Sequence, residues 1–237
     1  MATIRELRPE TPQAMTLVLD VPDWPGHRPG QHVDIRLTAD DGYQAERSYS
    51  IASPPENPDL ELTIERIDDG EVSPYLTEEA QPGDQFELRG PVGGYFVWDS
   101  SLEGPVLLVA GGSGLVPLMA ILRHHRATGS GADIRLLLSA RTLDDVLYRE
   151  ELAGVRDARA AAVHLTLTRD QPPPAWDGWS RRIDGEMLAA VGPRPEAHPH
   201  VYACGPTPFV EEAARLLVEL GHLPAAVHTE RFGPTGG

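Results

Sequence analysis

The spacing of apolar residues changes near residue 104 of this 237-residue chain. Up to about Trp98 the apolar runs are short and alternate with polar residues, as in "MTLVLDV" and "LELTIERI". From Gly104 onward the runs are continuous, as in "VLLVA" and "IRLLLS". Alternation is typical of strands that expose one face, whereas continuous runs are typical of parallel strands covered on both faces. The chain is therefore expected to form two domains, residues 1–101 and residues 102–237, with the boundary in "DSSLEGP".

Turn-forming residues separate the short runs of the first half. The stretches "DWPGHRPG", "SPPENPD" and "QPGD" are rich in proline, glycine and aspartate, which end strands and form tight turns. Many short strands between such turns indicate an antiparallel barrel or sandwich. Only "SPYLTEEA" offers a plausible helical turn in this half.

Predicted strands and helices alternate in the second half. "LVPLMAILRHHRATG" has helical spacing, with Pro117 in its first turn and Gly129 near its end. Further strands are predicted at "VHLTLT", "HVYAC" and "AAVHTE", and further helices at "DDVLYREEL" and "PFVEEAARLLVEL". This alternation predicts a doubly wound α/β domain with a parallel sheet. "RDQPPPAWDGWSRR", residues 169–182, is expected to be a surface loop.

A single cysteine, Cys204, limits the chemistry of the chain. It excludes an internal disulfide, a four-cysteine zinc site and a cysteine-ligated iron–sulfur cluster within these residues. Neighbouring histidines such as His124 and His125 diverge on a helix and lack a matching third ligand, so no metal site is expected. The lone cysteine and the lack of an apolar signal core at the N-terminus indicate a reducing, cytoplasmic location.

The charge of the chain is uneven as well as negative. A formal net charge of −16 argues against nucleic acid as a partner. Residues 1–103 carry 7 arginines and 21 acidic residues, whereas residues 104–237 carry 13 arginines and 15 acidic residues. The second half therefore has guanidinium groups to offer an anionic ligand. The uncharged stretch Pro105–Leu122 contains three glycines and Pro117, so it predicts a buried strand and a helix rather than a membrane span.

Two short motifs suit nucleotide binding. In "VAGGSGLVPL" a predicted strand runs into glycines and a helix start, where the backbone can approach a pyrophosphate and free N–H groups point outward. It lacks the P-loop lysine and has Pro117 where the usual dinucleotide fingerprint has its last glycine. "RSYSIAS" puts a basic residue, an aromatic and two hydroxyls on a strand, which suits a phosphate and a ring. Each motif alone is also compatible with an ordinary turn or strand.

Taken together and in this order, the motifs resemble the ferredoxin–NADP reductase family. The matching stretches are "PGQHVDI", "RSYSIAS", "GEVSPYL", "GDQFELRGPVGGYF", "VAGGSGLVPL", "SARTLDDVLYREEL", "YACGPTPFVEEA" and "ERFGPTGG". The resemblance covers almost the whole chain. It implies an antiparallel β-barrel that binds a flavin, followed by a doubly wound α/β domain that binds a nicotinamide nucleotide.

The resemblance implies specific roles in the first domain. It gives Arg47 a flavin phosphate, Tyr49 one face of the isoalloxazine ring and Ser50 a hydrogen bond near flavin N5. The turn around Gly70 matches a second phosphate-binding turn that serves FAD in most members, so FAD is favoured over FMN. The candidate cofactor contacts of this domain are Arg47, Ser48, Tyr49, Ser50, Glu65, Gly70, Val72 and Ser73.

In the second domain the resemblance implies contacts with the nicotinamide nucleotide. The glycines match the pyrophosphate loop, and "CGP" matches the motif that brings nicotinamide beside the flavin. Phe232 matches an aromatic residue that covers the other flavin face and gives way to nicotinamide. The candidate contacts are Gly111, Gly112, Ser113, Gly114, Cys204, Gly205, Pro206 and Phe232.

The chemistry implied by the resemblance is hydride transfer, which needs two stacked rings held in near contact, so most of the catalysis is positioning. The candidate catalytic residues are Ser50, Cys204, Glu230 and Phe232. The hydroxyl and the carboxylate would handle the accompanying proton, and the sulfur would pack against nicotinamide. Cys204 is not expected to act as a thiolate nucleophile, because no base or metal pattern accompanies it.

The arginines after the middle strands bear on the choice of nucleotide. In NADP-dependent relatives a hydroxyl and arginines at these places bind the 2′-phosphate. This chain has Ser139 and Arg141 after one strand, Thr168 and Arg169 after the next, and the pair Arg181–Arg182 beyond the loop. Bidentate guanidinium–phosphate contacts are the usual device, so NADPH is favoured over NADH.

The resemblance therefore implies a monomeric flavoprotein reductase with neither a nucleic acid nor a membrane partner. NADPH would deliver hydride to FAD, and single electrons would pass to a separate protein such as ferredoxin, flavodoxin or an oxygenase component. The acidic first domain would repel an acidic carrier unless a patch such as Arg28, Arg36 and Arg89 offsets it. The alternatives are an NADH-dependent reductase of an oxygenase or haem system, a reductase portion severed from a longer protein, and a regulatory subunit without turnover.

Overall fold

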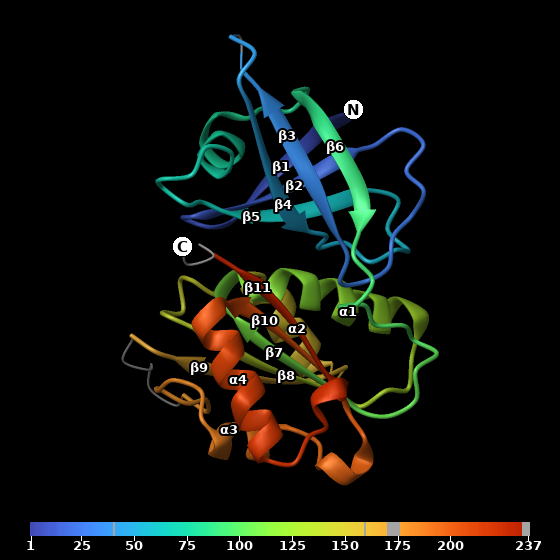
Figure 1. The fold of residues 1–237 in the computed structure, drawn as a ribbon, viewed down its shortest axis with the longest axis vertical. Coiled ribbons are helices and arrows are strands. Elements are labelled where there is room, and N and C mark those ends of the chain that lie inside the picture. Colours follow the sequence, from blue (N-terminus) through green and yellow to red (C-terminus); the bar gives the residue numbers. More distant parts are fainter. Residues whose placement is uncertain (40, 159, 170–175, 234–237) are drawn as a thin grey trace.

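Six antiparallel strands form the first domain of the computed structural model, which describes residues 1–39, 41–158, 160–169 and 176–233. Their order is β4-β3-β6-β1-β2-β5, and a bridge between Ile51 and Leu62 joins the two outer strands. The sheet therefore curls into a barrel (Figure 1), as the resemblance implies. The strands are β1 (Ala2–Thr11), β2 (Ala14–Asp20), β3 (His32–Thr38), β4 (Gln44–Ser50), β5 (Leu60–Glu65) and β6 (Gln85–Val92).

The barrel core comes from the alternating pattern of its strands. Leu17 and Leu19 of β2 pair in register with Leu62 and Leu60 of β5, and all four are buried. Each such side chain contributes about 1.5–3 kcal/mol relative to an exposed position. The predicted helical turn is present as η1 (Tyr75–Glu79), which closes over this core.

Five parallel strands form the second domain, in the order β11-β10-β7-β8-β9. Apolar residues of α1 and α2 cover one face of the sheet, and those of α3 and α4 cover the other. The prediction of a doubly wound α/β domain is thus confirmed. The elements are β7 (Val106–Gly111), η2 (Gly112–Gly114), α1 (Leu115–Thr128), β8 (Ile134–Ala140), α2 (Arg149–Asp157), β9 (Ala162–Leu167), α3 (Gly185–Val191), η3 (Pro195–Ala197), β10 (His200–Pro206), α4 (Thr207–Glu219), η4 (Pro224–Ala226) and β11 (Val227–Phe232).

The uncharged stretch Pro105–Leu122 consists of β7, η2 and the first half of α1, as predicted. Among the described residues no helix is long and apolar enough to cross a membrane. Part of the predicted surface loop, residues 170–175, lies outside the described residues. Its far end returns to the sheet, where Trp179 forms a parallel bridge with Thr166 of β9.

One hydrophobic core joins the two domains. Phe96 and Trp98, which follow the last barrel strand, belong to the same cluster of buried side chains as α1 and the neighbouring face of the parallel sheet. The phenol of Tyr202 in β10 donates a hydrogen bond to the Val97 carbonyl, 2.9 Å away. The expected boundary at residue 101 lies in the connection between β6 and β7, whose residues 96–98 pack into the second domain.

Candidate active site

The glycine loop lies where the order of the parallel strands reverses. β10 and β8 flank β7 on opposite sides, and ligands of such sheets bind beyond the carboxyl ends of the strands at this point. Here the loop after β7 meets the end of β10. A Cβ on Gly114 would lie 2.1 Å from the carbonyl oxygen of Cys204, so only glycine allows the two backbones to approach this closely.

The middle of the loop faces open space. Gly112 has a φ of +55°, and nothing lies within 4 Å of the position of a Cβ there. The loop continues as η2 into the first turn of α1, whose leading N–H groups have no partner within the helix. A left-handed glycine and free N–H groups suit an anionic group such as a pyrophosphate.

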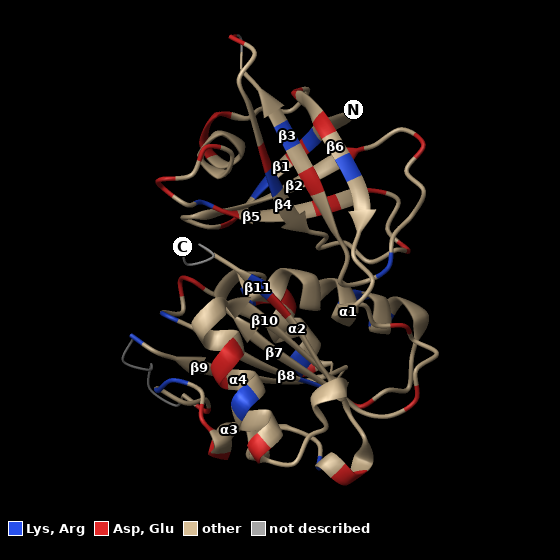
Figure 2. Ribbon diagram, viewed as in Figure 1, with Lys and Arg blue, Asp and Glu red and all other residues tan. Residues whose placement is uncertain are grey.

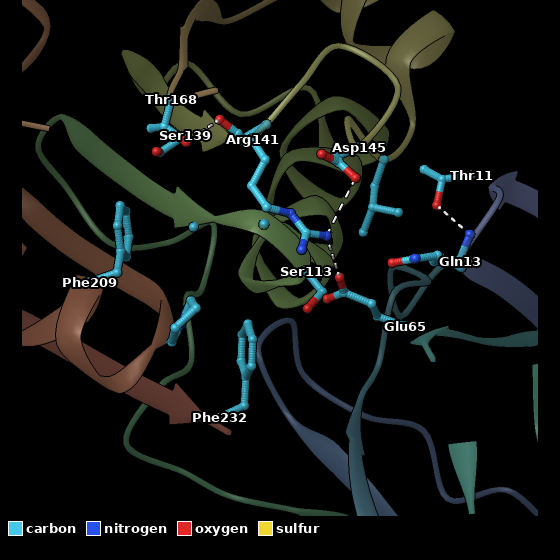
Figure 3. A pocket seen from close by; sticks show the side chains of 16 residues that line it. Thr11, Gln13, Glu65, Ser113, Ser139, Arg141, Asp145, Thr168, Phe209 and Phe232 are labelled. Atoms are coloured by element: carbon cyan, nitrogen blue, oxygen red, sulfur yellow. Dashed lines mark hydrogen bonds and ion pairs between the residues drawn. The ribbon is translucent and has the colours of Figure 1, made fainter. Parts of the chain in front are cut away.

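A cavity of about 270 Å³ lies between the domains at this loop. Figure 3 shows residues of the barrel and of the parallel-sheet domain facing one another across it. The barrel contributes Thr11, Gln13, Ala14 and Glu65. The second domain contributes Gly111, Gly112, Ser113, Ser139, Ala140, Arg141, Asp145, Leu147, Thr168, Pro206, Phe209 and Phe232.

Sequence reasoning missed several of these lining residues. Thr11 ends β1 and Gln13 lies in the turn between β1 and β2, where no motif points to a ligand. Phe209 follows the "CGP" motif and packs against Gly111, where a Cβ would lie 2.7 Å from the phenyl ring. The proline and the aromatic residue that follow the motif could have pointed to Phe209, whereas no sequence signal pointed to the turn.

Arg141 extends into the cavity and meets two carboxylates (Figure 3). Its Nη2 lies 3.4 Å from Oδ1 of Asp145 and 3.7 Å from Oε1 of Glu65. The second Asp145 oxygen accepts hydrogen bonds from the backbone N–H and the hydroxyl of Thr142. Asp145 therefore builds a turn in its own domain, while Glu65 reaches across from the barrel.

The other predicted residues of the 2′-phosphate region divide into two groups. The N–H groups of Thr168 and Arg169 donate to the carbonyls of Ala140 and Arg141, which places the ends of β8 and β9 side by side. Arg181 lies apart, because it bonds Asp184 at 2.6 Å and Glu186 at 2.8 Å. Arg182, the neighbour of Arg181, is exposed.

The candidate proton-handling groups meet across the domain boundary. The Ser50 hydroxyl, at the end of β4, donates a hydrogen bond to Oε1 of Glu230 in β11 at 3.1 Å. Glu230 is also the register partner of Cys204 in the neighbouring strand β10. Burial raises the pKa of Glu230, while the Ser50 hydrogen bond and the attraction of His32 act in the opposite direction. Ser50, Cys204 and Glu230 are therefore brought together.

Cys204 is fully buried in this structure. Burial, and then the negative charge of Glu230, raise the pKa of its thiol well above the ordinary value, while a hydrogen bond involving the Gly205 backbone lowers it. The thiol is therefore protonated at neutral pH, and a protonated thiol is a poor nucleophile. This agrees with the prediction that Cys204 is not a thiolate nucleophile.

The raised pKa of Glu230 gives a prediction for stability. In the unfolded chain a glutamate ionises near pH 4.3, about its ordinary pKa, whereas burial raises the pKa of Glu230 in the folded protein. The raised pKa favours folding at low pH, and this contribution is lost as pH rises through the folded pKa. Glu230→Gln removes the ionisation. Its free energy of unfolding in urea, relative to the parent, should therefore be higher near pH 7 than near pH 4.

A glutamate with the opposite shift is the matched control for this test. The hydrogen bond from Arg215 lowers the pKa of Glu212, so ionised Glu212 favours folding at neutral pH and loses this effect in acid. Glu212→Gln should therefore lose stability relative to the parent near pH 7 and not in acid. Equal differences for Glu230→Gln at both pH values would contradict the raised pKa.

The other candidate flavin residues lie on β4 and on the turn that precedes η1. Arg47 is exposed and pairs with Glu71 at 3.3 Å. The ring of Tyr49 is half-buried against the barrel core, and burial raises its pKa. The Ser48 hydroxyl donates to Asp34 on β3 at 2.6 Å, so it lies on the opposite side of β4 from Arg47 and Tyr49.

The turn that precedes η1 is tightly built. The Ser73 hydroxyl accepts the N–H of Ile67 at 3.0 Å, and Val72 is fully buried. A Cβ on Gly70 would lie 2.9 Å from the Ile67 carbonyl. The turn therefore has a fixed shape, and Glu71, the partner of Arg47, projects from it.

A network around Arg123 of α1 fixes the domains to each other. Its guanidinium donates to the Ala52 carbonyl at 2.9 Å and to Glu61 at 3.2 Å in the barrel. It also bonds Glu151 of α2 at 2.6 Å and lies 4.8 Å from the ring centroid of Tyr148. Ala52 is two residues beyond Ser50, so this arginine anchors the end of the candidate flavin strand.

The Tyr148 ring extends this network into the barrel. It is buried, its backbone has a φ of 52°, and its phenol hydrogen-bonds the Thr63 hydroxyl of β5. Thr63 in turn lies 2.7 Å from the hydroxyl of Thr16. The left-handed backbone of a non-glycine residue is costly, and here it aims the ring across the domain boundary.

Comparisons with known proteins agree with this two-domain architecture. Residues 11–97 match the family described as the oxidoreductase FAD-binding domain, and residues 108–215 match the oxidoreductase NAD-binding domain. The two matches define an oxidoreductase with separate FAD and nicotinamide-nucleotide domains.

One relative matches most of the chain along most of its own length. It is ferredoxin–NADP reductase B of Sorangium cellulosum, 34% identical over 86% of this chain and 84% of the relative. The chain belongs to the ferredoxin–NADP reductase family.

Other relatives differ in length. The glycine betaine monooxygenase reductase subunit of Chromohalobacter salexigens is 33% identical over 88% of this chain but only 56% of its own length. The chain thus spans little more than half of several curated relatives. The FAD/NAD-binding domain of a Vibrio cholerae nitric oxide dioxygenase superposes with a TM-score of 0.87, covering 98% of both chains at 24% identity. This last likeness is one of fold.

Proposed function

We propose that the protein is a flavoprotein reductase, in which NADPH delivers hydride to bound FAD and single electrons then pass to a separate protein acceptor. One observation carries the proposal. The hydrogen bond between Ser50 and Glu230 joins the end of the candidate flavin strand to the strand beside Cys204. A hydroxyl, a carboxylate and a thiol from two domains thus meet where the two cofactors would have to meet.

The residues of the barrel fit FAD by their chemistry. The exposed guanidinium of Arg47 suits a phosphate, and the Tyr49 ring suits an aromatic plane. The compact turn at Gly70 lies beside Arg47, because Glu71 of this turn pairs with its guanidinium. When bound, FAD accepts a hydride equivalent from a nicotinamide and releases electrons singly.

The chain's own residues would position the reacting rings and exchange the accompanying proton. Phe232 lines the cavity near the glycine loop and would exclude water from the space in which nicotinamide has to lie. Ser50 would hold a proton at its hydroxyl, and the raised pKa of Glu230 makes its carboxyl easier to protonate than that of an ordinary glutamate. The neutral thiol of Cys204 would supply a packing surface rather than a bond.

The preference for NADPH rests on the far end of the cavity. Ser139, Arg141 and Thr168 line this end, and Arg169 follows directly on Thr168. Two hydroxyls and two guanidinium groups suit a 2′-phosphate better than a neutral ribose. Two acidic residues that line the same cavity, Glu65 and Asp145, weaken this preference and support NADH as the second nucleotide.

The acceptor is proposed from the relatives and from charge. Relatives bear the names of a glycine betaine monooxygenase reductase subunit and a ferredoxin–NADP reductase, so an oxygenase component, a ferredoxin or a flavodoxin is the proposed class. Acidic segments are spread over the barrel (Figure 2). Arg36 of the suggested patch pairs with Glu46 at 3.4 Å and Glu87 at 3.3 Å, so it offers little charge to an acidic carrier. An acceptor that is not strongly acidic fits better.

The flavin spectrum of the purified holoprotein tests the proposal. Anaerobic addition of NADPH should bleach the flavin absorbance, faster than the same concentration of NADH does. Release of the cofactor followed by chromatography should identify FAD. Absence of bleaching with either nucleotide would refute the reductase function and favour a regulatory flavoprotein.

Replacement of Cys204 tests its positioning role. Cys204→Ala should slow flavin reduction about tenfold or more, because small displacements of stacked reactants are costly, while flavin content stays that of the parent. Stopped-flow absorbance under anaerobic conditions measures the rate. Cys204→Ser nearly keeps the size of the side chain, so its rate of flavin reduction should lie between those of the parent and of Cys204→Ala. If Cys204→Ala reduces the flavin as fast as the parent, Cys204 is a packing residue without a positioning role.

A further inference from the structure

Arg141 has partners on both sides of the cavity. Asp145 holds it from its own domain at 3.4 Å, and Glu65 holds it from the barrel at 3.7 Å. All three side chains line the same cavity and are partly exposed to solvent, with Arg141 45% and Glu65 36% exposed. Figure 3 shows the guanidinium between the two carboxylates.

The position of Glu65 is fixed by the barrel. Glu65 ends β5 and pairs in register with Ala14 of β2, and the next N–H, of Arg66, donates to the Gln13 carbonyl at 2.7 Å. Gln13 and Ala14 themselves line the cavity. The carboxylate of Glu65 is therefore presented by a paired strand, and it faces the cavity as a rigid part of the flavin domain.

We propose that Glu65, a residue of the flavin domain, limits the preference of the nucleotide domain for a 2′-phosphorylated nucleotide. This inference rests on the proposed function, in which Arg141 binds the 2′-phosphate of NADPH. A phosphate that takes Arg141 must displace Glu65 and then lies between two carboxylates, Glu65 and Asp145. At neutral pH a phosphate monoester carries about −1.5 to −2 charges, so the carboxylates repel it.

A nucleotide without this phosphate meets a different environment. Its ribose hydroxyls are neutral donors, which a carboxylate accepts without repulsion. Glu65 therefore disfavours the phosphorylated nucleotide selectively. The choice between the two nucleotides is then set jointly by the two domains, because the attracting group lies on one and the repelling group on the other.

Binding of the oxidised nucleotides to the holoprotein tests the inference without turnover. Dissociation constants of NADP⁺ and NAD⁺ are measured by isothermal titration for the parent and for Glu65→Gln. We expect Glu65→Gln to lower the dissociation constant of NADP⁺ about threefold to tenfold, as removal of one like charge at a partly exposed site allows. The dissociation constant of NAD⁺ should change less than about twofold. The matched control is Glu87→Gln, which removes a carboxylate from another arginine pair on the barrel, with Arg36, and should leave both constants unchanged.

A second variant separates the inference from the proposed function. Arg141→Gln should weaken the binding of NADP⁺ more than that of NAD⁺. In the double variant, Glu65→Gln should have little further effect on the ratio of the two dissociation constants. If the ratio is unchanged in Glu65→Gln while Arg141→Gln weakens NADP⁺, the role of Glu65 is overturned and the function stands. If neither nucleotide binds the parent, the proposed function itself fails. Glu65→Gln could instead change the NADP⁺ to NAD⁺ ratio equally in the parent and in Arg141→Gln. That result would show that Glu65 and the phosphate do not compete for Arg141.

Discussion

Gly114→Ala should abolish the native packing of the nucleotide loop. The added Cβ would lie 2.1 Å from the Cys204 carbonyl oxygen, 2.4 Å from its carbon and 2.6 Å from the Gly205 nitrogen. These are backbone atoms of a central strand, so no side chain can move aside to make room. We expect a loss of about 3 kcal/mol or more in the free energy of unfolding, at the upper end of overpacking effects, measured by urea denaturation.

The same substitution at an open glycine is its control. Nothing lies within 4 Å of a Cβ on Gly154 in helix α2, and alanine is favoured over glycine within helices by about 0.5–1 kcal/mol. Gly154→Ala should therefore leave the protein as stable as the parent or more so. Native stability in Gly114→Ala would show that β7 and β10 can separate at this point, contrary to the close approach described above.

Arg123→Met should uncouple the two domains. The variant keeps most of the apolar side chain but loses the bonds to the Ala52 carbonyl, Glu61 and Glu151. Glu61 is only 13% exposed, so the variant leaves a partly buried carboxylate with less compensation. Removal of one partner from a buried ion pair costs about 3–5 kcal/mol. Partial exposure and the remaining pair of Glu61 with Arg8 favour the lower end here. Urea unfolding followed by far-UV circular dichroism and by flavin fluorescence should give two transitions instead of one.

An exposed arginine with two ion-pair partners is the control for Arg123. Arg215 pairs with Glu212 and Glu219 on the surface of α4 and is 52% exposed. Exposed pairs contribute about 0–1 kcal/mol, so Arg215→Met should unfold in a single transition close to that of the parent. A single, unshifted transition for Arg123→Met as well would mean that the shared apolar core alone holds the domains together.

The hydrophobic pattern predicts most elements of the fold and misses those that tertiary contacts determine. Strand β1 was missed because only Ala2 and Ile4 of its ten residues are buried, so its sequence has no alternation to detect. Helix α3 is short and was not predicted. The helix predicted at "DDVLYREEL" begins only at Arg149, because Asp145 caps a turn with Thr142 and the buried Tyr148 takes a left-handed backbone.

Local sequence motifs are enough to predict those parts of the site in which a single loop provides the contacts. The glycine loop and the end of β10 were recognisable because each is a short stretch of special backbone, as at Gly112 and Gly114. The Glu65–Arg141 pair was not predictable as a pair, since its members lie in different domains and nothing in either segment specifies the other. The same holds for the anchoring of Ala52 by Arg123.

The core shared by the two domains has a consequence for biosynthesis. A ribosome makes the barrel first, yet Phe96 and Trp98 are buried in a cluster that consists mostly of side chains of the second domain, including those of α1 and the parallel sheet. Until those residues emerge, the nascent barrel presents an aromatic face to water, the kind of surface that chaperones bind and that promotes aggregation. Burial of these aromatic residues of the first domain therefore waits for translation of the second domain, and slow decoding after residue 105 would prolong the vulnerable interval.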